Sequence, residues 1–529
     1  MAKDDSVFDE PQAGQLVHDE TPSGVSELAH DRSFFGHPGG LSTLFFTEMW
    51  ERFSYYGIRP LLILFMTAAL FDGGFGFDRQ TAAAIVGIYA ACVYLASLPG
   101  GWIADRWLGL RRAIWYGGVF IAAGHVAIAL SAVFAQSVFF VGLILIVIGT
   151  GLLKPNISAI VGDLYPEGGS RRDAGFSIFY MGINIGALAA PLLTGFLGER
   201  VGWHWGFGAA GAGMIAGLIT YRLRAPRTLG SIGMEPAAEL PEQRRVRMIS
   251  LGALAVIVAL VLATLAGIIR IDAVAVAESM TMVILAMALG YFAYLFFLGG
   301  LTTDEKKRIG VIVVLFLFAT IFWSAFEQAP TSLNLFARDF TDRTIGGWEV
   351  PTLWLQSANS FFVITLAPVF AAVWIALGKR KRDPSSPAKF AIGLFFAGLG
   401  FLIMVAAANK VISAAAAGEA VRVSMLWLVA SYFLQTLGEL SLSPVGLSSM
   451  TKLAPRKFVG QMMGVWFMAA ALGNLIAGLV GGRVDPENLQ QMPELFLRTA
   501  LSLFIATIVL ALLIVPIRRM MRGSSAVSH

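Results

Sequence analysis

The residues that most clearly point to chemistry lie close together near the start of the chain. Glu48, Glu51 and Arg52 occupy about one turn of a long apolar run, and Arg59 follows two turns later. Ionisable side chains cost about 2.5 to 3.5 kcal/mol each at the centre of a membrane span, and they mark ion pathways, proton relays or substrate sites. The sequence therefore predicts a transporter.

The spacing of the first three charges favours a proton site. Glu48 lies one helical turn from both Glu51 and Arg52, so the three side chains can share one helix face. Two carboxylates beside one guanidinium leave one carboxylate uncompensated, and a proton could neutralise it. The alternative is a static ion-pair network that ties this helix to its neighbours.

Further polar residues lie inside other apolar runs, where they need a reason to be buried. They are Lys154, Asn184, Glu327, Asn359 and Glu439. Together with Arg59 they would place cations and carboxylates around a central cavity, and opposed charges are what a zwitterionic substrate needs.

The composition is that of a membrane protein. Of 529 residues, 57% are hydrophobic and only 14% are charged, against about 25% charged in soluble domains. The formal charge of +5 comes from Lys and Arg in short loops, so it gives no indication of nucleic-acid binding. The lone cysteine, Cys92, excludes an intrachain disulfide and a thiolate metal cluster. We expect no metal, cofactor or enzymatic activity.

The positioning elements must be membrane-spanning helices, which need about 20 mostly apolar residues each. Six are expected in a first bundle, two apolar ones in the middle of the chain, and six in a second bundle. The expected ranges are 41–71, 80–103, 112–134, 137–162, 174–198 and 203–223; then 248–270 and 277–299; then 308–337, 351–378, 387–408, 422–450, 457–482 and 494–517. Small residues such as Gly186 and Gly473 should allow close helix approach.

These helices define a division of the chain and its orientation. We expect a disordered cytoplasmic tail, the first bundle, a polar linker, two additional helices, the second bundle and a short tail, at 1–40, 41–224, 225–247, 248–300, 301–520 and 521–529. Cytoplasmic loops carry an excess of Lys and Arg. On that rule most of the 39 basic residues fall inside if both termini are cytoplasmic.

A loop after the second helix resembles the signature loop of the major facilitator superfamily. It reads Gly101-x-x-x-Asp105-Arg106-x-x-Gly109-x-Arg111-Arg112. The resemblance implies two six-helix bundles with a substrate site between them. Asp105 and Arg106 would latch neighbouring helices and release when the bundles rock; the alternative is a basic loop that only sets orientation.

Four further strings together resemble the proton-dependent oligopeptide transporter (POT) family, bacterial type, from Gly40 to the last helix. They are Glu48-x-x-Glu51-Arg52-Phe-x-Tyr55-Tyr56, Lys154-Pro-Asn, Phe179-Tyr-x-x-Ile-Asn184-x-Gly186 and Gly438-Glu439-Leu-x-x-Ser443-Pro-x-Gly446. Bacterial members carry two extra central helices, which agrees with a total of fourteen. The resemblance implies that di- and tripeptides are imported together with protons by alternating access.

The resemblance also implies a role for each polar residue. Arg59 and Lys154 would bind the peptide carboxylate, whereas Glu439, Asn184 and Asn359, with Ser443 nearby, would surround the peptide amine. Aromatic walls would tolerate varied side chains, although Trp and Tyr in spans also serve as packing or interface anchors. The aromatic candidates are Tyr55, Tyr56, Tyr94, Trp323, Trp466 and Phe467.

Coupling and gating follow from the same family pattern. Animal members carry a histidine where this chain has Gly87, so coupling would rely on Glu48, Glu51 and Arg52, and on Glu327. Arg59 with Glu327 would close the outside of the cavity, and Lys154 with Glu439 would close the inside.

Three alternatives stay open on the sequence. A carrier of the same fold could take nitrate or another small anion, or export drugs, and a chain of another class could be a non-transporting nutrient receptor. The paired charges for both peptide termini favour a peptide symporter. Its partners would be short peptides, protons and the lipid bilayer of the cell membrane, and it would work as a monomer.

Overall fold

The computed structural model describes residues 31–418 and 422–522, and this part of the chain is almost entirely helical. A segment in lipid must satisfy its backbone hydrogen bonds internally, which a helix does. Eleven of the described helices are long and apolar enough to cross a membrane.

The first half of the chain forms six long helices. They are α2 (Gly39–Thr67), α3 (Arg79–Ile103), α4 (Leu110–Leu130), α5 (Gln136–Asp163), α6 (Gly169–Arg200) and α7 (Trp203–Thr228). A 3-10 turn, Leu70–Asp72, follows α2, and a π-helical turn, Ala104–Leu108, continues α3.

Two apolar helices, α8 (Leu240–Leu265) and α9 (Ala273–Phe297), follow the first six. Val246 is the one residue of α8 that is buried among those described. By contrast, α9 packs against α3 of the first half and against α10 (Thr303–Phe326) and α15 (Val459–Gly481) of the second. The pair therefore lies outside the core, with α9 beside the junction of the halves.

The second half begins with a broken helix. After α10 the chain passes through a π-helical turn, Ala329–Leu333, into the short helix α11 (Asn334–Phe340). The break places Glu327 at the end of α10. The remaining elements are the short strands β1 (Thr341–Asp342), β2 (Thr344–Ile345) and β3 (Trp348–Glu349), a 3-10 turn (Thr352–Gln356), α12 (Ser357–Lys379), α13 (Ser386–Ala416), β4 (Val423–Ser424), α14 (Leu426–Leu453), a 3-10 turn (Arg456–Phe458), α15, and α16 (Gln491–Arg522).

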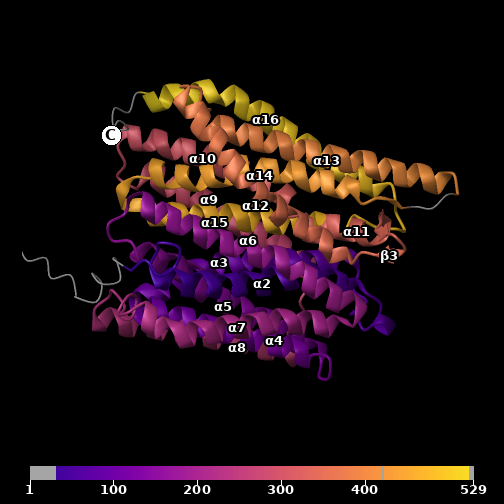
Figure 1. Cartoon of the computed structure of the whole chain (residues 1–529), viewed down its shortest axis with the longest axis horizontal. Coiled ribbons are helices and arrows are strands. Elements are labelled where there is room, and N and C mark those ends of the chain that lie inside the picture. The colour runs from indigo at the N-terminus through magenta and orange to yellow at the C-terminus, as the bar shows by residue number, and fades with distance from the viewer. Residues whose placement is uncertain (1–30, 419–421, 523–529) are drawn as a thin grey trace, which may run out of the picture.

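The helices run side by side in two stacked groups, one from each half of the chain (Figure 1). The halves meet where α3 packs on α15 and where α6 packs on α12. β2 pairs with β3 antiparallel, and β1 pairs with β4 parallel. The described residues form fourteen long helices in this arrangement, which confirms the predicted all-α polytopic class and agrees with two six-helix bundles and an additional pair.

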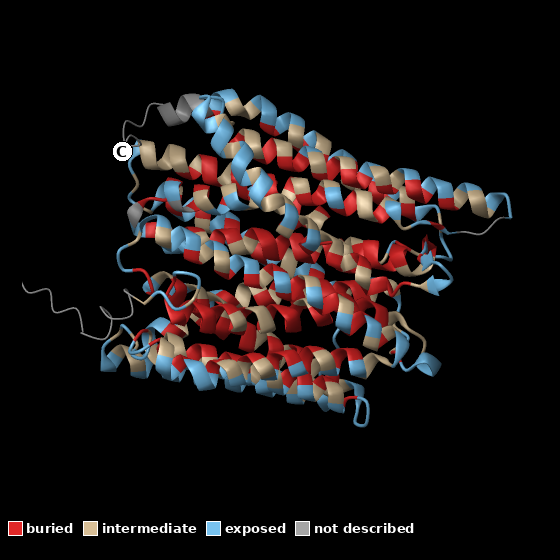
Figure 2. Ribbon diagram, viewed as in Figure 1, coloured by how far each residue is buried: buried red, intermediate tan, exposed pale blue. Residues whose placement is uncertain are grey.

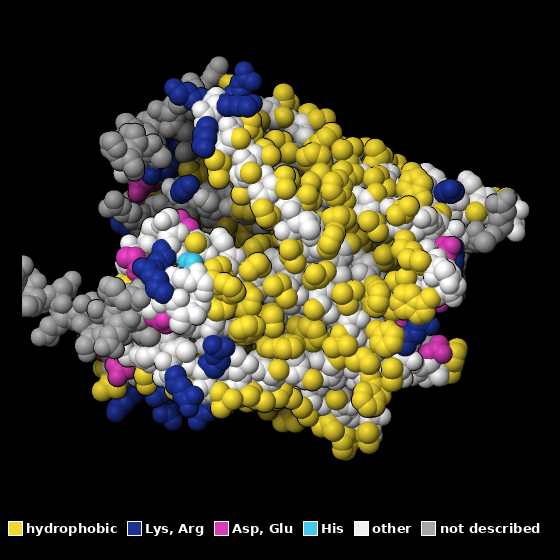
Figure 3. Space-filling model, viewed as in Figure 1, with side chains coloured by type: hydrophobic (Ala, Val, Ile, Leu, Met, Phe, Trp, Pro, Cys, Tyr) yellow, Lys and Arg dark blue, Asp and Glu magenta, His cyan; other side chains and the backbone are white. Residues whose placement is uncertain are grey.

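Buried residues concentrate along the middle of the molecule, and exposed ones lie on its perimeter (Figure 2). The visible face is covered by hydrophobic side chains, while Lys and Arg gather at the end where the described chain begins (Figure 3). We call the end where α2 starts the inner end, after the predicted cytoplasmic N-terminus. The opposite end, where α11 and β3 lie, is called the outer end.

Two predicted boundaries differ from the observed helices. Residues 1–30 of the expected tail lie outside the described residues, but residues 31–40 are held against the bundle, where Arg171 of α6 donates a hydrogen bond of 2.8 Å to the Asp31 carbonyl. The Asp31 carboxylate also accepts a hydrogen bond of 2.6 Å from the Gly39 backbone N–H. Burial raises the pKa of Asp31, but hydrogen bonds from Gly39 and Ser33 outweigh it and lower the pKa. The expected linker, 225–247, shrinks to 229–239, because the polar ends of α7 and α8 extend beyond their apolar stretches. Of the expected tail 521–529, residues 523–529 lie outside the described residues.

Candidate substrate and proton site

The structure brings together the three charges of the first helix. Arg52 Nε lies 3.2 Å from Glu48 Oε1 and also donates a hydrogen bond to Glu51 Oε2. All three residues are buried, with at most 3% of their surface exposed. Glu48 Oε2 and Arg52 Nη2 are buried without a hydrogen-bond partner among the described residues. Lys154 on α5 lies within electrostatic range of both carboxylates but forms no salt bridge with them among the described residues, so one carboxylate can take up a proton.

A histidine lies behind this cluster, which the sequence did not reveal. His125 Nε2 on α4 lies 2.5 Å from Ser54 Oγ, inside the first family string of α2. The two residues are 71 positions apart, so no periodicity connects them. The side chains fix α4 against α2.

Arg59 joins the two halves of the molecule. Its Nη2 donates to Glu327 Oε2 at the end of α10 and, over 2.6 Å, to Asn474 Oδ1 on α15. The guanidinium carbon also lies 5.8 Å from the centre of the Tyr55 ring. The predicted pair of Arg59 and Glu327 is therefore formed. Asn474 was missed, although an asparagine inside an apolar run was a signal for it.

Lys154 does not meet its predicted partner in this structure. Its Nζ lies 4.4 Å above the centre of the Tyr94 ring, a cation–π contact. Tyr94 in turn lies 6.4 Å from Phe467 of α15, so this contact spans the two halves. Within the described part of the chain, no salt bridge links Lys154 to Glu439. Both side chains are half-buried.

Glu439 on α14 belongs to a small polar group of the second half. Asn359 Nδ2 donates to Glu439 Oε2 and to Thr436 Oγ1, each over 3.0 Å. Asn184 of α6, in the first half, donates its amide N–H to the Tyr180 carbonyl over 3.0 Å, and its amide oxygen is an acceptor. Ser443 is half-buried one turn beyond Glu439. Thr436 was missed, because it lies outside the family strings.

The aromatic candidates separate by exposure. Tyr56, Tyr94 and Phe467 are half-buried, so part of each ring is accessible. Tyr55 is buried between Tyr56 and Tyr89, at ring distances of 5.2 and 6.2 Å.

The two tryptophans are packed inside the second half. Trp466 is 6% exposed, and a side chain at Gly446 would collide with its ring. Trp323 is 9% exposed and lies against Phe322 and Phe326. Such burial favours the packing alternative for both residues.

The signature loop makes a different contact from the one expected. Arg106 pairs with Glu242 at the start of α8, so it connects the first bundle to the additional helices. The Asp105 carboxylate is exposed and makes no ion pair with a described residue. The exposed pair of Arg106 and Glu242 contributes little, because solvent screens it.

Comparison with known proteins decides the family. A model of the POT family matches residues 111–492. The chain belongs to the POT family. One relative is the peptide transporter YePEPT of Yersinia enterocolitica, which is 52% identical over 93% of this chain and 97% of that protein. Another is the di-/tripeptide transporter of Lactococcus lactis, which is 39% identical over 84% of this chain and 89% of that protein. The crystal structure of a peptide transporter POT in complex with sulfate has a TM-score of 0.86 at 40% identity, covering 94% of this chain and 99% of that one.

Membership of the POT family confirms the resemblance drawn from the motif strings. It makes this chain a membrane protein of a transporter family. The roles of the individual residues stay predictions.

Proposed function

We propose that this POT-family protein is a proton-coupled symporter that imports di- and tripeptides by alternating access. The observation that carries the proposal is the set of buried charges at the junction of the two halves: cations on the first half and a carboxylate with amide partners on the second. The names of the relatives, a peptide transporter and a di-/tripeptide transporter, support it.

The two ends of a peptide would bind to opposite halves. Arg59 and Lys154 would hold the peptide carboxylate, because guanidinium and ammonium groups donate charge-assisted hydrogen bonds to it. Glu439 would bind the peptide amine, since Asn359 occupies only one of its two oxygens. Asn184 would add its amide oxygen. No peptide side chain is needed for these contacts, so selectivity would be broad.

Proton coupling would lie on α2. A proton on Glu48 or Glu51 would leave the other carboxylate paired with Arg52 and would weaken the attraction to Lys154, whereas loss of the proton would restore both buried negative charges. Glu327 is the second candidate, because its protonation would weaken the contact with Arg59. A peptide carboxylate would compete for the same guanidinium.

The described conformation fits an inward-facing state. The outer pair, Arg59 with Glu327, is formed, whereas no inner pair of Lys154 with Glu439 is present among the described residues. Closure of the inner pair with release of the outer pair would then produce the opposite state.

Location and assembly complete the proposal. Fourteen crossings return the chain to the side from which it started, and the basic residues gather at that end (Figure 3). We place the protein in the cell membrane with both termini in the cytoplasm, working as a monomer.

The deciding experiment is uptake of labelled dialanine into proteoliposomes, with and without an inward proton gradient. Wild type should accumulate the peptide only with the gradient. Glu51→Gln should lose gradient-driven accumulation at least about tenfold but retain counterflow exchange, because peptide binding does not need this carboxylate. Glu278→Gln is the matched control, since Glu278 is exposed on α9. Absence of dialanine transport by wild type would refute the peptide assignment and favour a small-anion or drug carrier.

A further inference from the structure

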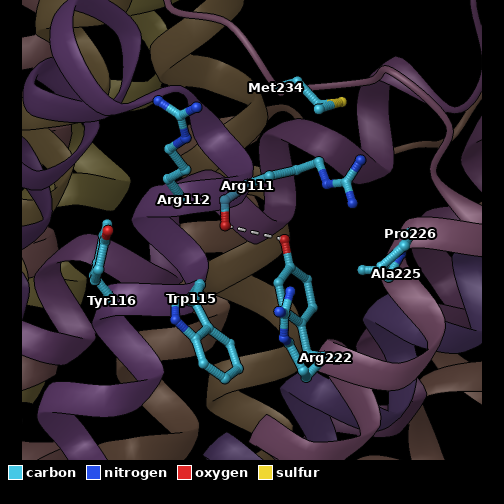
Figure 4. A pocket seen from close by; sticks show the side chains of 9 residues that line it. Arg111, Arg112, Trp115, Tyr116, Arg222, Ala225, Pro226 and Met234 are labelled. Atoms are coloured by element: carbon cyan, nitrogen blue, oxygen red, sulfur yellow. Dashed lines mark hydrogen bonds between the residues drawn. The ribbon is translucent and has the colours of Figure 1, made fainter.

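A basic pocket lies at the inner end, away from the buried charges at the junction of the two halves. It has a volume of about 220 Å³ and lies between the start of α4, the end of α7 and the segment that follows α7. Arg111, Arg112 and Arg222 line it together with Trp115 and Tyr116 (Figure 4). The end of α7 lies beside the start of α2, where Thr43 and Thr228 are joined by a hydrogen bond of 2.8 Å.

The charge of this pocket is not compensated from within. Nine residues line it, of which three are arginines and none is acidic. Within the described part of the chain, none of these arginines takes part in a salt bridge. The N-terminal end of α4, which begins at Leu110, adds the positive end of its helix dipole. Such a pocket attracts an anion.

Two of the three arginines, Arg111 and Arg222, are held in place by neighbours and still keep N–H donors for a ligand. Arg111 Nη1 donates to the Gly230 carbonyl over 2.6 Å, and Tyr221 donates its hydroxyl to the Arg111 carbonyl over 3.2 Å. The Arg222 guanidinium lies 5.6 Å from the centre of the Trp115 ring. A guanidinium carries five N–H donors, so the remaining ones can bind an anion.

The surroundings of the pocket point to lipid. Ile215, Ile219 and Leu223 follow one face of α7 toward it and are exposed by 43%, 54% and 66%. Trp and Tyr side chains are typical of the membrane interface, where a polar edge meets an apolar ring. A ligand here would meet cations at its head and an apolar helix face along its tail.

We propose that this pocket binds the phosphate headgroup of an anionic phospholipid, whose acyl chains lie along the exposed face of α7. Arg112 and Arg222 supply the charge, and Arg111 connects the headgroup to the segment after α7. Basic pockets between helices on the cytoplasmic side have this chemistry in other membrane proteins. None of its lining residues belongs to the proposed peptide and proton sites.

The test is native mass spectrometry of the purified full-length protein with phosphatidylglycerol or phosphatidylcholine of equal chain length. Wild type should bind phosphatidylglycerol preferentially. Arg112→Gln/Arg222→Gln should weaken that binding about thirtyfold, roughly fivefold for each charge near the surface. Arg244→Gln/Arg247→Gln is the matched control, because it also removes two exposed arginines at the inner end of the molecule. These two lie near the start of α8, outside the pocket.

Each other outcome overturns the proposal. If the control variant lost as much phosphatidylglycerol binding as the pocket variant, anionic lipid would be attracted to the whole inner end and not to the pocket. If wild type bound both lipids equally, it would have no headgroup site. Displacement of phosphatidylglycerol by soluble glycerol phosphate at similar concentration would assign the pocket to a free phosphate compound. The wild-type lipid preference stands as a test even where the double variant fails to fold.

Discussion

Glu439 is a half-buried carboxylate with one oxygen left for a ligand. One of its oxygens accepts a hydrogen bond from Asn359, and the other remains for a ligand. The negative charge is held half-buried without a basic partner in the described part of the chain. An ammonium group in this position would gain both the charge and the hydrogen bond.

Replacement of Glu439 by Gln should weaken dialanine binding about 10- to 100-fold, because a hydrogen bond to a charged group contributes about 1.5 to 3 kcal/mol. The measurement is equilibrium binding to purified protein. N-acetyl-dialanine, which lacks the charged amine, provides the matched control: its affinity should be similar for wild type and Glu439→Gln. Equal weakening for both peptides would assign Glu439 a structural role and remove it from the amine site.

At the scale of elements, close contact between α3 and α15 explains why position 87 is glycine. A Cβ atom at Gly87 would lie 2.8 Å from the Asn474 carbonyl oxygen and 2.9 Å from Gly478 Cα. Both neighbours are backbone atoms, which cannot move aside alone. In this conformation there is no room for a side chain as large as histidine at position 87.

We expect Gly87→Ala to destabilise this conformation by about 1 to 3 kcal/mol, the usual cost of overpacking. Gly208→Ala is the matched control, since Gly208 lies within α7 and a Cβ there meets nothing within 4 Å. In that helix interior alanine should stabilise by about 0.5 to 1 kcal/mol. Thermal unfolding in detergent measures both. Equal shifts of the two midpoints would contradict the close contact.

The sequence predicted the helices well because membrane spans have one dominant signal, a long apolar run. It predicted the close approaches at Gly186 and Gly473 too, where side chains would collide with Met49 and Trp323. It missed Asn474, Thr436 and the pair of Ser54 and His125, since each depends on which faces of distant helices meet. It also missed the ends of α7 and α8, whose polar turns extend beyond the apolar runs of these helices.

At the scale of the whole molecule, the contacts between the halves are concentrated toward the outer end. Arg79, at the start of α3, donates to Asp339 of α11 over 2.6 Å and to the Val484 carbonyl over 2.7 Å. Glu199, at the end of α6, accepts hydrogen bonds from Thr352 and Leu353. The predicted pair of Arg59 and Glu327 is therefore one member of a larger outer closure.

This distribution makes outer opening sensitive to Arg79, even though it lies outside the family strings. Arg79→Ala removes two hydrogen bonds to the second half. A hydrogen bond from a charged donor contributes about 1.5 to 3 kcal/mol, so the equilibrium between the outer-closed and outer-open conformations should shift about 10- to 100-fold toward the open one. Spin labels on Leu70→Cys and Ile345→Cys, in a Cys92→Ser background, report the outer separation. In Arg79→Ala we expect a larger fraction of molecules with a long distance between the two labels than in wild type.

Arg498→Ala serves as the control for that measurement. Arg498 pairs with Glu494 of the same helix, α16, and its side chain is 65% exposed, so its loss breaks an ion pair without touching the other half. The outer distance should stay as in wild type. A second change, Asp339→Ala, should add little opening to Arg79→Ala if the two residues act as one contact, because coupled residues are not additive. Full additivity would mean that Arg79 and Asp339 hold the outer end closed through separate partners.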